Sequence, residues 1–547
     1  MAEGRECVGK AAKGVSRREV LRAGGAAALA AAAGGRADAE TAPALAVPPF
    51  ELEEATIADL QAAMTTGRHT AQSIAEAYLA RIEAVDRVLR SVIEVNPDAL
   101  SIAARLDDER RAGQVRGPLH GIPVLIKDNI ATADRMETTA GSLALVGAKA
   151  PRDAYVVRRL REAGAVILGK TNLSEWANFR STQSSSGWSG RGGQCANPYA
   201  LDRNPCGSSS GSGAAVAANL AAVAVGTETD GSVVCPSHAC GLVGLKPTLG
   251  LVSRSGIVPI AHSQDTAGPM ARTVADAAAL LAVLAGADPD DPATAGRPRS
   301  NGYSAAADAA ALRGARIGVA RAKVTGYSPE ADAVFESALA ALREAGAVLV
   351  DPADIPRLGE YDDEEFEVLL YEFKADLEAY LKAWAPGATA RTLAGLIAFN
   401  EAHRAEELPY FGQEIFTSAV EKGPLTDKAY RKALAACRKL SRDDGLAPLF
   451  EKNRLDAVVA PTGGPAWPTD LVNGDHFLGA SSTPAAVSGY PGITVPAGFS
   501  FGLPVGITFI GKPWTEGVLL SLAAAFESVT NVRRPPRFLA TADLAAR

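Results

Sequence analysis

The chain has 547 residues, of which 47% are hydrophobic and 21% are charged, the balance of a folded globular protein rather than a disordered one. The formal net charge is −7, and the first 39 residues contribute +3, so the rest of the chain carries −10. An acidic body of this kind argues against a nucleic-acid partner.

Residues 1–39 have the three parts of a twin-arginine export signal. Arg17 and Arg18 lie in a basic segment, an apolar run follows at 26–33, and the small residues of 37–39 form a cleavage site. The apolar run is too short to cross a membrane as a helix. We therefore expect an exported protein, periplasmic or extracellular, without a membrane anchor. An alanine-rich disordered tail is the alternative interpretation.

Helical and strand patterns alternate along the rest of the chain. Helical spacing of apolar residues occurs at 48–96, 273–286, 331–344 and 518–529. Strand patterns occur at 123–126, 165–168, 315–320, 347–350, 456–460 and 503–511. This order predicts one large α/β domain at 40–547, with a mixed, mostly parallel twisted sheet covered by helices on both faces. Amphipathic helices at 364–381 and 426–441 indicate a helical insertion at about 355–450.

Five cysteines lie outside the predicted signal, namely Cys195, Cys206, Cys235, Cys240 and Cys437. Their number is odd and their spacing uneven, so we expect no disulfide framework. A zinc site is also not expected. Cys235 and Cys240 flank His238, but no second pair of ligands has the spacing of a zinc finger.

A lysine follows the strand predicted at 123–126. Lys127 comes directly after an apolar run, so its ammonium group cannot easily stay in water. Burial lowers the pKa of a lysine and can leave a neutral amine at working pH. Lys127 is therefore a candidate general base.

The stretch 206–248 holds two turns rich in glycine and serine. The first is GSSSGS at 207–212, the second is TETDGS at 227–232, and a small, apolar segment at 214–224 separates them. A segment of this composition must be buried, so the turns do not form a flexible linker. Two interpretations fit the pattern. The glycines could let the backbone approach a ligand closely, or they could serve only tight helix packing with no catalytic role.

Two familiar motifs fit this stretch poorly. The run 207–211 matches the G-x-S-x-G nucleophile elbow, but Asn204 and Pro205 precede it in place of the required strand. The segment 241–248 is similar to a phosphate-binding loop, but Leu245 stands where a glycine belongs. A serine nucleophile activated by a lysine is the third interpretation.

Four motifs in chain order resemble the amidase signature family. They are GIPVLIKDN at 121–129, GSSSGS at 207–212, GTETDGS at 226–232 and CGLVGLKPT at 240–248. The resemblance covers about residues 55–530 and implies the amidase signature fold, hydrolysis of amide C–N bonds and no metal or cofactor. Three segments are similar to the peptide amidase branch of the family, whose members deamidate C-terminal carboxamides of peptides: 226–232 with Cys235, 187–194 and 370–374.

Carried onto this sequence, the family's catalytic triad falls on Lys127, Ser208 and Ser232. The resemblance implies that Ser232 is the nucleophile and that Ser208, after a cis peptide bond with Gly207, relays its proton to Lys127. Main-chain N–H groups of Thr229, Asp230, Gly231 and Ser232 would form the oxyanion hole. Ser209 is expected to support the relay by hydrogen bonding or to cap the following helix.

Two residues depart from the wider family. Asp230 stands where glycine is commoner, and Val234 stands where arginine is usual. We expect the Asp230 carboxylate to repel an anionic substrate end, which favours a terminal carboxamide over a free carboxylate. The absence of the arginine argues against substrates that depend on it.

The expected function is release of ammonia from carboxamides, foremost C-terminal amides of peptides, through a Ser-cisSer-Lys triad and an acyl-enzyme. The alternatives are a broad acyl- or aryl-amidase, an amidotransferase component working with partner proteins and tRNA, and a non-catalytic binding protein. The export signal argues against the amidotransferase, and the presence of all three triad residues argues against the binding protein. The expected partner is a small amide or short amidated peptide, and no oligomeric state is predicted.

Overall fold

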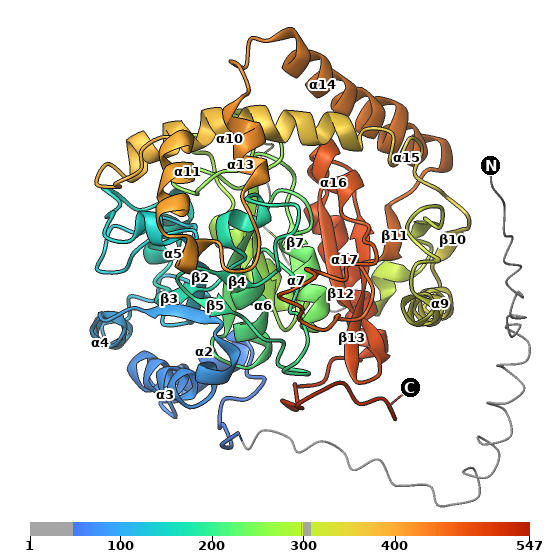
Figure 1. Cartoon of the computed structure of the whole chain (residues 1–547). Helices are drawn as coiled ribbons and strands as arrows, with labels where there is room; N and C mark the ends of the chain where they lie inside the picture. The colour runs from blue at the N-terminus through green and yellow to red at the C-terminus, as the bar shows by residue number, and fades with distance from the viewer. Residues whose placement is uncertain (1–46, 297, 299–302, 304–307, 547) are drawn as a thin grey trace, which may run out of the picture. The chain divides into compact units, whose positions relative to one another are not determined.

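The computed structural model describes residues 47–296, 298, 303 and 308–546 (Figure 1). The predicted export signal at 1–39 lies outside the described residues. All of the described residues belong to one unit, residues 43–547.

Within the part of the chain that the structure describes, eleven strands form one mixed sheet. In spatial order they are β1 (Val92–Val95), β3 (Val166–Thr171), β2 (Pro123–Lys127), β6 (Val223–Glu228), β8 (Thr266–Ala271), β7 (Val243–Lys246), β12 (Gly492–Ser500), β13 (Leu503–Ile510), β11 (Ala457–Pro461), β9 (Arg316–Val319) and β10 (Val348–Val350). Parallel pairing occurs in the two groups β3–β2–β6 and β11–β9–β10, and the remaining pairs are antiparallel. A short hairpin, β4 (Trp188–Ser189) and β5 (Gly193–Gln194), forms a second sheet.

Helices pack on both faces of the sheet, as predicted. Along β11, Ala457 and Val459 belong to the main core, whereas Val458 and Ala460 belong to a second one. Successive side chains of a strand point to opposite faces, so at β11 the two cores lie on opposite faces of the sheet. Along β2 the consecutive residues Val124, Leu125 and Ile126 all belong to the main core, which therefore covers both faces there. Helices α9 (Pro329–Glu344) and α17 (Glu516–Thr530) contribute to the first core, and α15 (Ala447–Asn453) and α16 (Thr483–Ser488) to the second. The predicted α/β class is confirmed.

The other described α-helices are α2 (Ile57–Thr65), α3 (Ala71–Leu89), α4 (Ala99–Arg111), α5 (Tyr155–Glu162), α6 (Ser210–Ala217), α7 (Val234–Ala239), α8 (Val274–Leu284), α10 (Asp362–Trp384), α11 (Leu393–Ala402), α12 (Arg404–Glu407), α13 (Glu414–Val420) and α14 (Lys428–Arg438). Several of these helices, among them α3, α5, α6 and α8, also contribute side chains to the main core. Short 3-10 helices are η1 (Leu143–Leu145), η2 (Glu175–Asn178), η3 (Pro292–Gly296) and η4 (Ala309–Leu312), and η5 (Lys439–Leu446) is a π-helix. Among the described helices, none has the length and apolar character that a membrane span requires.

Strand β1 differs from the expectation that residues 48–96 are helical throughout. Helix α3 ends at Leu89, and Arg90 after it takes a left-handed backbone conformation with φ of 51°. Strand β1 is only four residues long and partly exposed at the edge of the sheet. A strand this short has too few positions for a period of two to stand out from a helical pattern.

Helix α10 spans one end of the sheet, as Figure 1 shows in yellow and orange. It holds the loop that precedes β8: Glu372 accepts a hydrogen bond from Ser263 N (2.8 Å), and Glu365 accepts one from Gln264 Nε2 (2.8 Å). The described chain from α10 to α15 contains helices and no strands, in the range for which the sequence predicts a helical insertion, about 355–450. Helix α10 packs against the loop that leads into β8.

Candidate active site

Lys127 lies at the carboxyl end of β2 and has no exposed surface. Its Nζ donates hydrogen bonds to Ser208 Oγ (2.7 Å), to Thr227 Oγ1 (2.9 Å) and to the Thr227 carbonyl oxygen (3.3 Å). Strands β2 and β6 are parallel neighbours, so their carboxyl ends lie at the same edge of the sheet. This pairing brings the end of β6, which carries Thr227, to the lysine.

Burial lowers the pKa of Lys127 from its ordinary value of 10.5 to about 7. The carboxylates of Asp265 and Glu228 act in the opposite direction, because a nearby negative charge favours the ammonium form. A large fraction of the amine is therefore neutral near pH 7. A neutral amine at hydrogen-bond distance from a serine hydroxyl can accept its proton.

The first turn places Ser208 beside this amine. The Gly207–Ser208 peptide bond is cis, as the resemblance implied. A Cβ atom at Gly207 would lie 2.2 Å from Ser174 Oγ, so no larger residue fits there. The Ser208 carbonyl accepts a hydrogen bond from Ser174 N (3.1 Å), and the Ser208 side chain is fully buried. The turn is thus fixed by its neighbours.

The second turn joins the end of β6 to α7. Glu228 accepts hydrogen bonds from the main-chain N–H groups of Val233 (2.7 Å) and Val234 (3.0 Å), which holds the start of α7. In the described part of the chain, no protein acceptor binds the main-chain N–H groups of Asp230, Gly231 and Ser232. Free N–H groups beside a nucleophile can stabilise the oxyanion of a tetrahedral intermediate.

Hydrogen bonds of Ser209 connect the two turns. Ser209 N donates to the Ser232 carbonyl oxygen (3.2 Å). Ser209 Oγ donates to the Thr227 carbonyl oxygen (3.1 Å) and accepts from Thr227 N (3.2 Å). Its side chain makes no capping bond to α6. Of the two roles considered for Ser209, the hydrogen bonding is therefore the one observed, and it is directed at Thr227, which also binds Lys127.

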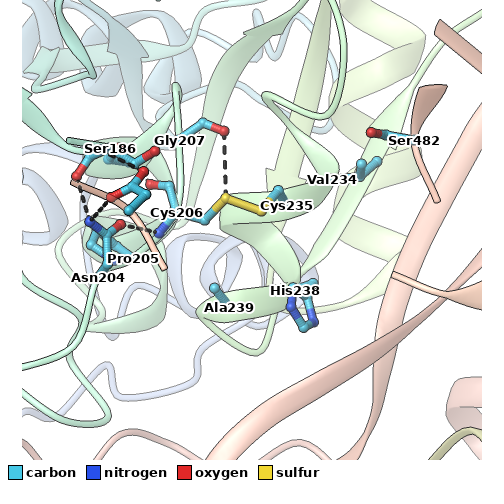
Figure 2. The surroundings of a disulfide bond; sticks show 12 residues. Ser186, Asn204, Pro205, Cys206, Gly207, Val234, Cys235, His238, Ala239 and Ser482 are labelled. Atoms are coloured by element: carbon cyan, nitrogen blue, oxygen red, sulfur yellow. Dashed lines mark hydrogen bonds between the residues drawn. A yellow bond between two sulfur atoms is a disulfide. The ribbon is translucent and has the colours of Figure 1, made fainter. Parts of the chain in front are cut away.

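A disulfide between Cys206 and Cys235 also joins the turns, although the odd number and uneven spacing of the cysteines predicted no disulfide framework. Figure 2 shows the bond between the residue before Gly207 and the first turn of α7. The two Cα atoms lie 6.0 Å apart although 29 positions separate them in sequence. Cys195, Cys240 and Cys437 are free and buried. Spacing along the chain did not reveal the pair, because the fold of β6 and α7 brings the two cysteines together.

A cavity of about 650 Å³ opens in front of the second turn. Its lining includes Gly207, Asp230, Gly231 and Ser232, of which Ser232 is 8% exposed. Lys127 and Ser208 are not part of this lining and are fully buried. A molecule in the cavity therefore meets Ser232, with the Ser208–Lys127 pair shielded from solvent.

Asp265 is a site residue that the sequence analysis missed. Its carboxylate accepts hydrogen bonds from Thr229 Oγ1 (2.6 Å), Ile260 N (2.8 Å) and Ala261 N (3.0 Å). Burial raises its pKa to about 6. A single aspartate before a strand gives no sequence signal of this role, and only the antiparallel pairing of β8 with β6 places it there.

Asp230 extends from the second turn towards α16. Its carboxylate accepts hydrogen bonds from the hydroxyl groups of Ser482 and Thr483, the latter at 2.6 Å. Burial raises the pKa of this carboxyl group, and the two hydroxyl bonds oppose the shift. The side chain thus presents acceptors at the cavity wall. Val234, the other departure from the family, is buried in the first turn of α7.

One group of side chains in the described chain has the spacing of metal ligands: His262, Glu372 and Asp376. The His262 ring is already paired, with Nδ1 2.8 Å from Asp376 and Nε2 3.4 Å from Glu372. The group does not line the cavity of Ser232. Its three side chains form a polar contact between α10 and the loop before β8.

Comparisons with known proteins agree with this geometry. The family model described as Amidase matches residues 73–520. A probable amidase of Arabidopsis thaliana is 43% identical over 503 residues, covering 90% of this chain and 93% of the relative. A component of the glutamyl-tRNA(Gln) amidotransferase of Chloroflexus aurantiacus is 37% identical, covering 89% of this chain and 99% of the relative. The X-ray structure of native peptide amidase from Stenotrophomonas maltophilia is 54% identical, with a TM-score of 0.85, covering 90% of this chain and 100% of that chain.

Proposed function

Because the chain belongs to the amidase family and is an amide-hydrolysing enzyme, we propose that it releases ammonia from the C-terminal carboxamides of peptides. Ser232 acts as nucleophile, Ser208 as proton relay and Lys127 as general base. The observation that carries this assignment is the 2.7 Å hydrogen bond from the fully buried Lys127 Nζ to Ser208 Oγ. The next residue, Ser209, donates its N–H to the carbonyl oxygen of Ser232, which lines the cavity.

Acylation begins with two proton transfers. Neutral Lys127 accepts the hydroxyl proton of Ser208 while Ser208 accepts that of Ser232, and Ser232 Oγ attacks the amide carbon. The oxyanion binds the free N–H groups of the second turn, each donor contributing about 3 kcal/mol to the transition state. The C–N bond then breaks, Ser208 gives its proton to the leaving nitrogen, and Lys127 returns a proton to Ser208. Ammonia leaves and the acyl group stays on Ser232.

Deacylation uses the same groups in the same order. Water enters the cavity and gives a proton to Ser208, whose own proton passes to Lys127. The hydroxide attacks the ester carbon, and the second tetrahedral intermediate collapses with the proton returning to Ser232 through Ser208. The product is the free carboxylic acid. Ser232, Ser208 and Lys127 return to their starting protonation states at the end of the cycle.

Three observations support peptide amides as the substrate class. The similar structure at 54% identity is a peptide amidase. The cavity of about 650 Å³ exceeds what a simple aliphatic amide needs. The Asp230 carboxylate at its wall disfavours a free carboxylate near the reacting carbon, so that an amide is preferred over the corresponding acid.

Export through the twin-arginine route remains part of the proposal. The disulfide between Cys206 and Cys235 suits an oxidising compartment, where such bonds persist. Replacing both Arg17 and Arg18 by lysine should retain the protein in the cytoplasm, measured by fractionation and immunoblotting. Unchanged export of that variant would refute the signal.

A substrate panel with ammonia detection tests the function. We expect an amidated dipeptide to be hydrolysed with a kcat/KM at least about 100-fold above that of a simple aliphatic amide, since remote binding energy lowers the barrier. Equal rates on aliphatic amides or aryl amides would instead indicate a broad amidase. Activity that requires a co-purifying partner protein would indicate an amidotransferase role.

A further inference from the structure

Aromatic side chains line the cavity in two pairs. On one side the rings of Phe179 and Phe366 meet edge to face at 6.2 Å, and on another those of Trp467 and Phe477 do so at 5.5 Å. Leu369 of α10 and Ile415 of α13 extend the first apolar surface. The cavity that holds Ser232 thus has apolar walls beyond its polar reacting end.

The residues that line the cavity differ widely in exposure. Ser232 is 8% exposed and Trp467 is 7% exposed, whereas Phe366 is 39% and Phe477 is 50% exposed. A scissile carboxamide must reach Ser232 at the buried end. The residues that precede the carboxamide in the substrate must then extend towards the mouth, past the two exposed rings.

We propose that Phe366 and Phe477 form an outer subsite for an apolar side chain on the residue that precedes the amidated one. The inference rests on the proposed function and names a further requirement of the same site. Large apolar side chains left exposed beside a cavity mark surfaces that a ligand covers. Among the described residues, no lysine or arginine lines this cavity, while Asp230 and Asp475 do, so an acidic side chain at that position is disfavoured.

The test is a series of dipeptide amides in which the last residue is alanine and the first is glycine, alanine, leucine, phenylalanine or glutamate. Covering an apolar side chain at the mouth should raise kcat/KM about tenfold from glycine to leucine or phenylalanine. The glutamate peptide should fall below the glycine peptide. Acetyl-alanine amide, which has no side chain at the tested position, serves as the reference substrate.

The double variant Phe366→Ser/Phe477→Ser should reduce the tenfold rise to less than about twofold and leave acetyl-alanine amide within about twofold of the parent. Both rings are partly exposed, so the variant should fold. Tyr410→Ser is the matched control, since Tyr410 is 47% exposed but does not line the cavity. It should keep the full rise.

The outcomes separate the two proposals. A flat series in the parent enzyme, or an unchanged rise in the double variant, overturns the subsite while hydrolysis of acetyl-alanine amide upholds the amidase function. If the enzyme hydrolyses none of the peptide amides, both the subsite and the proposed function are overturned. Binding of the same series to Ser232→Ala, measured by calorimetry, provides a readout of the subsite that does not depend on turnover.

Discussion

The carboxylate of Asp265 accepts a 2.6 Å hydrogen bond from Thr229 Oγ1, the first residue after β6. Its other oxygen binds the main-chain N–H groups of Ile260 and Ala261, so a single side chain fixes the loop before β8 to the turn that carries the free N–H groups. Asp265 also raises the pKa of Lys127 against the effect of burial. It is therefore a positioning residue for both halves of the site.

Replacing Asp265 by asparagine should lower kcat by about tenfold to a hundredfold with little change in KM, because the oxyanion turn loses its anchor. Removing the negative charge also removes a cause that raises the pKa of Lys127, so the acid limb of the kcat/KM profile should move to lower pH. Asp276→Asn is the control, since Asp276 is also buried and binds a main-chain N–H, that of Ile57, away from the site. A limb that moves to higher pH would contradict the assignment.

The pH dependence of the enzyme itself should follow Lys127. The amine must be neutral to accept a proton, and burial brings its pKa to about 7, so kcat/KM should rise with pH and level off above about 8. Lys127→Met should lower kcat by about 10³-fold or more while circular dichroism stays unchanged.

Lys170→Met is the matched control for this lysine. Lys170 is equally buried, and its pKa is lowered to about 8, but it donates to the Ile130 carbonyl and to Thr138 rather than to a serine of the turns. Its replacement should cost stability and leave the acid limb in place. Equal loss of kcat in both variants, at equal folded fraction, would mean that a buried charge and not a base was removed.

The serines should differ in the step that they affect. Ser232→Ala should abolish labelling by a fluorophosphonate probe, detected as loss of the mass shift on the intact protein. Ser208→Ala should still be labelled, but about 10²-fold more slowly, because only the relay is lost. Ser210→Ala is the control, since Ser210 Oγ donates to the Cys206 carbonyl (2.6 Å) and contacts neither Lys127 nor Ser232. Labelling of Ser232→Ala at the parent rate would identify a different nucleophile.

Asp230 should govern discrimination between an amide and an acid. At pH 8 the carboxylate disfavours a free acid in the cavity, so Asp230→Asn should tighten inhibition by the peptide acid product about fivefold. The kcat/KM for the amidated peptide should change less than this. The prediction is checked by measuring the inhibition constant of the peptide acid for the parent and the variant. An unchanged constant would mean that Asp230 does not contribute to discrimination between amide and acid.

The disulfide should stabilise the site as well as the fold. Replacing Cys206 and Cys235 by serine should lower the free energy of unfolding by about 3 kcal/mol, the order expected for a closed loop of this length. Activity should fall too, because the bond ties the residue before Gly207 to the helix after Ser232. Dithiothreitol should reproduce the loss in the parent and have no further effect on the variant, and Cys437→Ala should resemble the untreated parent.

The fold class could be predicted from the amino-acid sequence alone, and the candidate triad was assigned from four motifs that resemble the amidase signature family. Strands β2 and β6 are buried on both faces, so they appear as continuous apolar runs, and the polar residues that end them stand out. Lys127 was recognisable for that reason, whereas the two serine-bearing turns were recognisable by their glycine and serine content. The short strand β1 could not be predicted, because four residues at a sheet edge carry too weak a pattern.

Which distant residues meet depends on the packing of the folded chain. The pairing of β8 with β6 brings Asp265 to Thr229, and the packing of α7 beside the first turn brings Cys235 to Cys206. Helix α10 and the loop before α16 supply aromatic side chains to the walls of the cavity. These contacts join segments with no common periodicity or motif, so their physical cause is the packing of the sheet edge and not any local signal in the chain.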